Sequence, residues 1–193
     1  MNLKRNIENN KKNYSLGIIG GGQLALMLAE AANNRGLKVC VQTKSSNDPA
    51  VSKADYVIQA DPLKVKGNKD LIKECEKIIF ENEWIKIEKL NLIETNNIFV
   101  PSLESIKPLV DRISQKKLID RMNLPSPKWL PMKDFKNLDY KETENWNFPL
   151  MVKSYKGGYD GKGNKKVHTK EDLKTFLNEN DSEQWLVEEW INY

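Results

Sequence analysis

The stretch LGIIGGGQLALMLAEAANNRG, residues 16–36, constrains the fold of this chain more than any other. An apolar run, Leu16–Gly20, leads through glycines into a segment whose apolar spacing predicts a helix ending at Gly36. A strand, a glycine turn and a helix in this order begin an α/β unit. The runs KVCVQT, YVIQA, IIFEN and IFV predict further strands, and residues 68–77 and 86–95 predict helices between them. A parallel sheet covered by helices is therefore expected.

The pattern changes from Pro101 onward. Residues 101–124 have apolar positions at helical spacing, interrupted at Pro108, and the proline-rich LPSPKWLPM that follows marks a domain junction. FPLMVKSY, KKVH and QWLVEEWI then predict strands, the first two joined as a hairpin, and Thr169 with Asp172 predicts a capped helix start. The expected division is a polar tail at 1–15, an α/β domain at 16–101, a helical linker at 102–127 and a smaller α+β lobe at 128–193.

Composition excludes several classes of protein. The chain has 193 residues, of which 39% are hydrophobic, so it can bury a core. It contains no apolar run long enough to cross a membrane, and its first fourteen residues contain no signal-like segment, so a cytoplasmic protein is expected. Most of the net charge of +4 lies in the tail, so no nucleic-acid partner is expected.

Metal and disulfide chemistry is also unexpected. Cys40 and Cys75 lie in apolar surroundings without ligand spacing, which predicts buried free thiols. His168 is the single histidine, so a histidine metal site cannot form. We therefore expect no metal ligands in this chain.

The first glycine motif contains Gly20-x-Gly22-x-x-Ala25, which matches a dinucleotide-binding pattern. Such glycines let backbone N–H groups approach an anion at the positive end of a helix. Nicotinamide and flavin enzymes usually carry an acid at the end of the second strand, where this chain has Gln42 and Thr43. The motif therefore favours phosphate binding, with close packing of helix on strand as the alternative.

The second glycine motif, KSYKGGYDGKGNKKV at 153–167, places four glycines within seven residues between two predicted strands. Such a hairpin can cover a polyphosphate, offering backbone N–H donors while the preceding Lys153 neutralises charge. It is not the strand–GxxxxGK[ST]–helix phosphate loop, because a strand follows it. The alternative is a surface hairpin whose lysines are solvated.

Five motifs in order, GGGQL, FENEW, VDRISQK, VKSYKGGYDGKGN and VEEWI, resemble the 5-(carboxyamino)imidazole ribonucleotide synthase family of ATP-grasp enzymes over residues 16–193. The resemblance implies a Rossmann-like parallel-sheet pre-ATP-grasp domain, followed by the small α+β lobe of an ATP-grasp fold. It also implies a reaction of purine biosynthesis: ATP and bicarbonate form carboxyphosphate, which carboxylates the amine of 5-aminoimidazole ribonucleotide.

The resemblance further implies residue roles. Arg112 and Lys153 would contact the ATP phosphates, and residues 188–191 would read the adenine and its sugar. The full set implied for ATP is Arg112, Lys153, Gly158, Tyr159, Asp160, Gly161, Lys162, Gly163, Asn164, Glu188, Glu189, Trp190 and Ile191. Tyr159 and Lys162, with Glu81 or Glu83, would face bicarbonate and the imidazole. Gly21, Gly22, Gln23 and Leu24 would bind the ribose phosphate of the substrate.

The chain departs from the family pattern at three places. Ala25 and Leu26 stand where Gly-Arg is common, and Asn164 stands where glutamine is usual. The family also continues for roughly as many residues again, with a second lobe that carries the magnesium ligands. We therefore expect a portion of such an enzyme that binds ATP but is inactive alone, and the resemblance leaves a homodimer open.

Three alternatives remain at this point. The chain could be a non-catalytic nucleotide- or phosphate-binding module. It could belong to another ATP-grasp ligase, such as the formate-using glycinamide ribonucleotide transformylase or a biotin carboxylase. An NAD-dependent oxidoreductase rests on the first glycine motif only.

Overall fold

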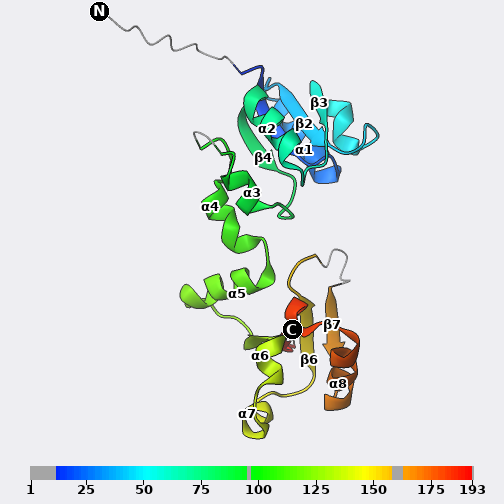
Figure 1. The fold of residues 1–193 in the computed structure, drawn as a ribbon, viewed down its shortest axis with the longest axis vertical. Coiled ribbons are helices and arrows are strands. Elements are labelled where there is room, and N and C mark those ends of the chain that lie inside the picture. Colours follow the sequence, from blue (N-terminus) through cyan, green and yellow to red (C-terminus); the bar gives the residue numbers. More distant parts are fainter. Residues whose placement is uncertain (1–11, 95–96, 158–162, 193) are drawn as a thin grey trace, which may run out of the picture. The chain divides into compact units, whose positions relative to one another are not determined.

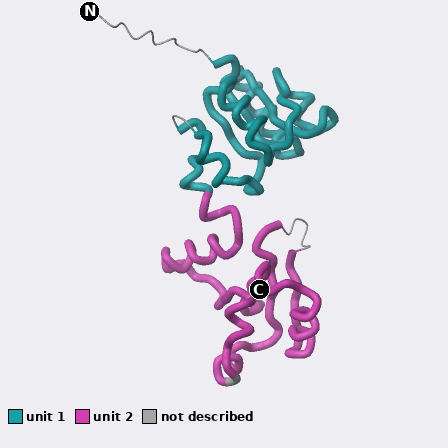
Figure 2. Tube along the Cα trace, viewed as in Figure 1, with its two compact units in different colours: residues 1–106 teal, residues 107–193 magenta. Residues whose placement is uncertain are grey.

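The computed structural model describes residues 12–94, 97–157 and 163–192. The chain divides into two compact units, residues 1–106 (unit 1) and 107–193 (unit 2) (Figure 2). Within the described residues, no helix is both long and apolar enough to span a membrane. The predicted subdivision of the second half into a linker at 102–127 and a lobe at 128–193 stays a prediction.

Unit 1 is built on a four-stranded sheet in the order β3-β2-β1-β4, in which all neighbouring strands run parallel (Figure 1). This confirms the parallel α/β fold that the sequence predicts. Its elements are β1 (Tyr14–Ile19), α1 (Gln23–Asn33), β2 (Val39–Thr43), η1 (Pro49–Lys53), β3 (Tyr56–Gln59), α2 (Val65–Glu74), β4 (Cys75–Phe80), α3 (Ile87–Asn91) and α4 (Leu103–Ile106).

Helices α1 and α2 cover opposite faces of this sheet. Ile18 and Val41 are register partners on one face and share a buried cluster with Ala25 and Ala29 of α1. On the other face, a side chain at Gly17 would meet Leu71 of α2 at 2.9 Å. Both faces are thus buried, as the near-continuous apolar strands indicate.

Two predicted elements of unit 1 differ from the structure. The helix predicted at 68–77 ends at Glu74, and β4 begins at the next residue, Cys75. Cys75 is buried and fits the helical spacing of Leu71, but backbone pairing with β1 decides its conformation. The strand predicted from IFV is a single bridge between Phe99 and Ile78.

Unit 2 is built on an antiparallel sheet in the order β5-β8-β6-β7. The predicted hairpin is confirmed as the pair β6 and β7. Strand β5, in the proline-rich segment, was not predicted. The elements are η2 (Lys107–Leu109), α5 (Arg112–Arg121), β5 (Trp129–Pro131), α6 (Met132–Lys136), α7 (Tyr140–Glu144), β6 (Leu150–Ser154), β7 (Asn164–Val167), α8 (Lys170–Glu179), η4 (Ser182–Gln184) and β8 (Trp185–Glu189).

One face of the second sheet packs on α6 and α8, and the opposite face carries charged side chains. Leu150, Val152 and Val187 point into a core shared with Phe135 of α6 and Phe176 of α8. Because successive side chains alternate between faces, Met151, Lys153 and Glu188 lie on the opposite face. The pattern of the strands thereby separates core residues from candidate functional residues.

Both cysteines are buried free thiols, as predicted. They are distant in sequence but close in space. A hydrogen bond with Cys40, together with burial, raises the pKa of the Cys75 thiol. The thiolate form is therefore disfavoured in the folded chain.

The start of α8 yields a stability prediction. The Thr169 side chain accepts from the Asp172 N–H at 3.1 Å, and Asp172 accepts in return from the Thr169 N–H, which confirms the predicted capping box. Replacing Thr169 with alanine should lower the free energy of unfolding by about 1 kcal/mol, because the Asp172 N–H loses its side-chain partner. Urea denaturation followed by circular dichroism measures it.

The matched control is Thr175→Ala, the same change at an exposed position inside α8. It removes no cap and improves helix propensity, so it should not destabilise the chain. Equal losses in the two variants would contradict the capping role.

Candidate functional site

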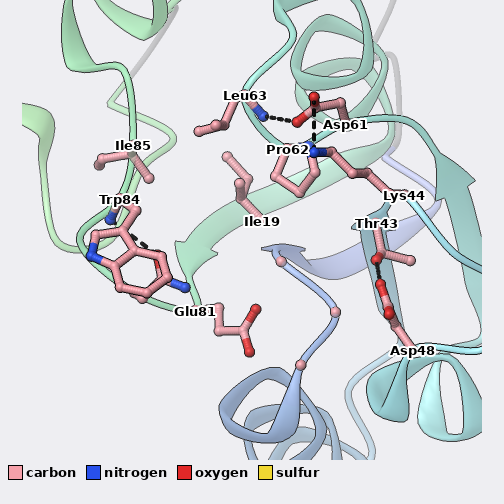
Figure 3. Close-up of a pocket in the computed structure, with 14 residues that line it drawn as sticks. Ile19, Thr43, Lys44, Asp48, Asp61, Pro62, Leu63, Glu81, Trp84 and Ile85 are labelled. Atoms are coloured by element: carbon pink, nitrogen blue, oxygen red, sulfur yellow. Dashed lines mark hydrogen bonds and ion pairs between the residues drawn. The ribbon is translucent and has the colours of Figure 1, made fainter. Parts of the chain in front are cut away.

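The glycine-loop pocket lies at the carboxyl ends of β1, β2 and β4 in unit 1 (Figure 3). Parallel strands place their carboxyl ends at one edge, so the loops that follow them converge there. The cavity measures about 280 Å³. It is lined by Ile19, Gly20, Gly21, Gly22, Thr43, Lys44, Asp48, Asp61, Pro62, Leu63, Glu81, Asn82, Trp84 and Ile85.

Only glycine fits at the loop positions of this pocket, because other side chains lie close to the backbone on both sides of the loop. Gly20 has a φ of +122°, and a Cβ there would lie 2.5 Å from the Cβ of Glu81. A Cβ on Gly22 would overlap the Glu81 carboxylate, and one on Gly21 would lie 2.6 Å from the Cβ of Thr43. The loop is therefore held between Glu81 and Thr43, with the carboxylate beside the start of α1, as Figure 3 shows.

Acidic groups outnumber cations among the described residues of the pocket. Lys44 forms an ion pair with Asp61 at 3.3 Å, and Thr43 donates a hydrogen bond to Asp48. The Leu63 N–H donates to Asp61 at 2.9 Å; this bond and, secondarily, Lys44 lower the pKa of Asp61. Glu81 adds a third carboxylate. The pocket thus offers acceptors for hydroxyl and amino groups as well as the N–H groups of the loop.

A second site lies on the face of the unit 2 sheet that is opposite to the core of that unit, and its centre is Glu188. This glutamate is 4% exposed and forms ion pairs with two lysines, Lys116 of α5 at 2.7 Å and Lys153 of β6. We call these three residues the lysine–glutamate site. A neighbouring cavity of about 200 Å³ is lined by Pro127, Met151, Lys153, Glu188, Glu189, Trp190 and Ile191.

Arg112 stands at the base of the glycine hairpin in unit 2. Its guanidinium donates to the Ser154 carbonyl at 2.8 Å and to the Gly163 carbonyl at 3.3 Å. Its backbone N–H donates to the Tyr155 carbonyl at 2.9 Å. Arg112 therefore joins both stems of the hairpin in the structure.

The structure brings most of the described predicted residues together within each unit. In unit 1, Gly21, Gly22 and Glu81 line one pocket, whereas Glu83 and Leu24 are exposed outside its lining. Gln23 begins α1 and is exposed.

In unit 2, Lys153, Glu188, Glu189, Trp190 and Ile191 line one cavity. Gly163 is buried where the hairpin resumes, and Asn164 begins β7 as the register partner of Lys153. The remaining predicted residues, Gly158, Tyr159, Asp160, Gly161 and Lys162, lie outside the described residues.

Comparison with known proteins agrees with this two-unit arrangement. Residues 14–108 match the ribonucleotide synthetase preATP-grasp domain, and residues 117–193 match the ATP-grasp domain. Together these two matches cover most of the chain. The α/β fold that the sequence predicts, a pre-ATP-grasp domain followed by part of an ATP-grasp domain, is thereby confirmed.

Two curated relatives of the chain carry the same name. The N5-carboxyaminoimidazole ribonucleotide synthase of Synechocystis is 34% identical over 180 residues, which are 93% of this chain and 45% of that protein. The synthase of Staphylococcus aureus is 30% identical over 178 residues, 92% of this chain and 47% of that protein. The chain spans about half the length of the curated relatives it matches.

A solved structure supports the same relationship. The N5-carboxyaminoimidazole synthetase of Staphylococcus aureus complexed with ADP has a TM-score of 0.83 and 29% identity to this chain. The match covers 94% of this chain and 48% of the solved one. The resemblance to this family, noted from five motifs, is thus confirmed.

Lys116 is not among the site residues that the sequence predicts. Lys116 lies four residues after Arg112 on α5, so both side chains share one face of that helix. That spacing was the available signal. The same spacing also occurs on a solvated helix face, and the sequence does not show that Glu188 packs against Lys116.

The lysine–glutamate site yields a second prediction. Replacing Glu188 with glutamine removes the charge that both lysines contact, so it should destabilise unit 2 by roughly 2–3 kcal/mol. Lys153 keeps 30% of its side chain exposed, which moderates the loss. Urea denaturation followed by tryptophan fluorescence measures it, because four of the five tryptophans follow residue 107.

The control is the adjacent Glu189→Gln, the same change at a less buried carboxylate. It should alter the free energy of unfolding by no more than about 0.5 kcal/mol. Equal effects of the two variants would show that the ion pairs of Glu188 are not important for stability.

Proposed function

We propose that this chain binds substrates in an enzyme that carboxylates 5-aminoimidazole ribonucleotide, using ATP and bicarbonate, to give 5-(carboxyamino)imidazole ribonucleotide. The observation that carries the proposal is the buried Glu188 between Lys116 and Lys153. Two ammonium groups fixed by one carboxylate form a cationic surface suited to a polyphosphate. The name shared by the relatives supplies the acceptor and the reaction.

Unit 2 is assigned to ATP. Lys116 and Lys153 neutralise phosphate charge, and the segment Glu188–Ile191 lies beside the cavity that would take the adenine. The solved relative of Staphylococcus aureus was complexed with ADP, which supports this assignment. Residues 158–162, with Gly163 and Asn164, are proposed to cover the phosphates, and Arg112 to hold the stems of that hairpin and reach a phosphate from there.

Unit 1 is assigned to the ribonucleotide. The N–H groups of Gly21, Gly22, Gln23 and Leu24 at the start of α1 are suited to the phosphate. The Glu81 carboxylate beside the same loop repels a dianion, so we place the hydroxyl and amino groups of the ribonucleotide against Glu81. Glu83 is the second acid of this motif, and its exposure makes it the weaker candidate.

The proposed reaction has two steps. A bicarbonate oxygen attacks the γ-phosphorus of ATP, and ADP leaves with the electrons of the broken P–O bond. The substrate amine then attacks the carboxyl carbon of carboxyphosphate, loses a proton, and inorganic phosphate leaves. Tyr159 and Lys162 are proposed to face bicarbonate, and Glu81 to orient the amine. A purine-biosynthetic reaction of this kind belongs to the cytoplasm.

Magnesium is proposed to accompany ATP, since polyphosphate transfer requires a metal to bridge phosphate oxygens. Within the part of the chain that the structure describes, no three His, Cys, Asp or Glu side chains group around a common point. No step is therefore assigned to magnesium through residues of this chain.

Calorimetric titration of the purified chain with ADP and, separately, with 5-aminoimidazole ribonucleotide tests the proposal. Lys153→Ala should weaken ADP binding roughly ten- to a hundred-fold, because a charge-assisted contact is lost, and leave ribonucleotide binding unchanged. Gly22→Ala should do the reverse, since its Cβ displaces the Glu81 carboxylate. Each variant thus serves as the control for the other unit.

Lys165→Ala provides the matched charge control. Lys165 lies on the hairpin strand β7, on the opposite face of the sheet, over the ring of Phe176. It should bind ADP as the unaltered chain does. Unchanged ADP affinity in Lys153→Ala would refute the ATP assignment. A chain that binds ADP but does not bind 5-aminoimidazole ribonucleotide would instead favour a nucleotide-binding module.

A further inference from the structure

Gln42 is a buried polar residue of unit 1 that does not line the glycine-loop pocket. Its exposure is 0%, and it lies at the position where a nicotinamide enzyme would carry an acid. Thr43, the next residue, faces the pocket, so alternation along β2 turns the Gln42 side chain toward α2. Its amide therefore has a role other than contact with a ligand.

Gln42 contacts the two loops that form opposite walls of the pocket. Its backbone carbonyl accepts from the N–H of Gly20, where the glycine loop begins, at 3.0 Å. Its side-chain Nε2 donates to the carbonyl of Asp61 at 3.1 Å and to Asn68 at 3.0 Å. Asp61 begins the turn that carries Pro62 and Leu63 into the pocket wall. One buried residue thus joins both walls.

The surroundings of Gln42 are shaped to hold its amide. Gly67 of α2 leaves the necessary room, since a Cβ there would lie 2.7 Å from Gln42 Nε2 and 2.6 Å from the Cβ of Ala60. Asn68 of α2 is 4% exposed, and its Oδ1 accepts the second hydrogen bond of Gln42 Nε2. The two amides are therefore buried partners between β2 and α2.

Burial of an amide is costly unless it is hydrogen-bonded, and an apolar side chain of similar size would fill the space between β2 and α2 without that cost. One side-chain hydrogen bond of Gln42 goes to the loop carbonyl of Asp61, and the other goes to the buried Asn68 of α2. The bond to Asp61 fixes the position of the Asp61 backbone, and therefore also the position of the Asp61 carboxylate that pairs with Lys44.

We propose that Gln42, supported by Asn68, is a positioning residue that sets the separation between the glycine loop and the 61–64 turn, and thereby the fit of the ribonucleotide in the pocket. The part that concerns the ribonucleotide rests on the proposed function. The part that concerns the two walls rests on the hydrogen bonds alone.

The experiment compares Gln42→Leu, Asn68→Leu and the double variant in the full chain. Each single variant leaves a buried amide without its partner and should lower Tm, whereas the double variant removes both amides and should recover most of that loss. Affinity for 5-aminoimidazole ribonucleotide should fall roughly ten- to a hundred-fold in all three, because the walls stay misplaced. A purely structural role predicts instead that affinity recovers with Tm in the double variant, which would overturn the proposal.

A control variant and a hydrogen-exchange experiment test the positioning role further. Gln59→Leu makes the same change at an exposed position on β3 and should alter neither Tm nor affinity. Hydrogen exchange without ligand should show faster exchange at residues 20–22 and 61–64 in Gln42→Leu, with β1 unchanged. Unchanged exchange there refutes the positioning role even if the unaltered chain binds no ribonucleotide, a result that would count against the proposed function alone.

Discussion

Close packing around the glycines of β1 and the loop that follows it is the constraint on which unit 1 depends. Gly17 lets α2 approach the central strand, where a Cβ would lie 2.9 Å from Leu71 and from Cys75. Three residues later, Gly20 and Gly22 accommodate Glu81 at the carboxyl edge of the sheet. One strand thereby determines both how the helix packs and which acid enters the pocket. A side chain at any of these positions would force its neighbours apart, since packed interiors have little free volume.

The two candidate sites have opposite electrostatic character. The described lining of the glycine-loop pocket carries three carboxylates and one lysine, and that lysine is already paired with Asp61. In unit 2, two lysines contact a single buried carboxylate, and Arg112 stands nearby on the same helix as Lys116. A ligand rich in hydrogen-bond donors suits the first site, and a polyphosphate suits the second. Glycine spacing in the sequence indicates backbone access at both motifs, but it does not indicate the charge of the side chains that pack beside each loop.

Local sequence patterns predicted elements well where a single rule applied. The parallel strands of unit 1, the hairpin of unit 2 and the Thr169 cap were confirmed, because apolar runs and capping residues act over short distances. The prediction was wrong where two rules competed. Cys75 fits a helical spacing yet begins β4, and β5 forms in a proline-rich segment because β8 supplies its hydrogen bonds. Lys116 was missed because its partner lies 72 positions away in the sequence.

The sequence by itself determined the order of the elements, the two glycine motifs and the family resemblance, since each depends on residues near one another in the chain. Only the tertiary structure decided which charged groups meet. It placed Glu81 in the pocket and Glu83 outside its lining, turned Gln42 away from the pocket toward Asp61, and brought Glu188 between two lysines. The physical reason is that charge pairing and buried hydrogen bonds join residues from different strands and helices, and their geometry exists only after the sheets have formed.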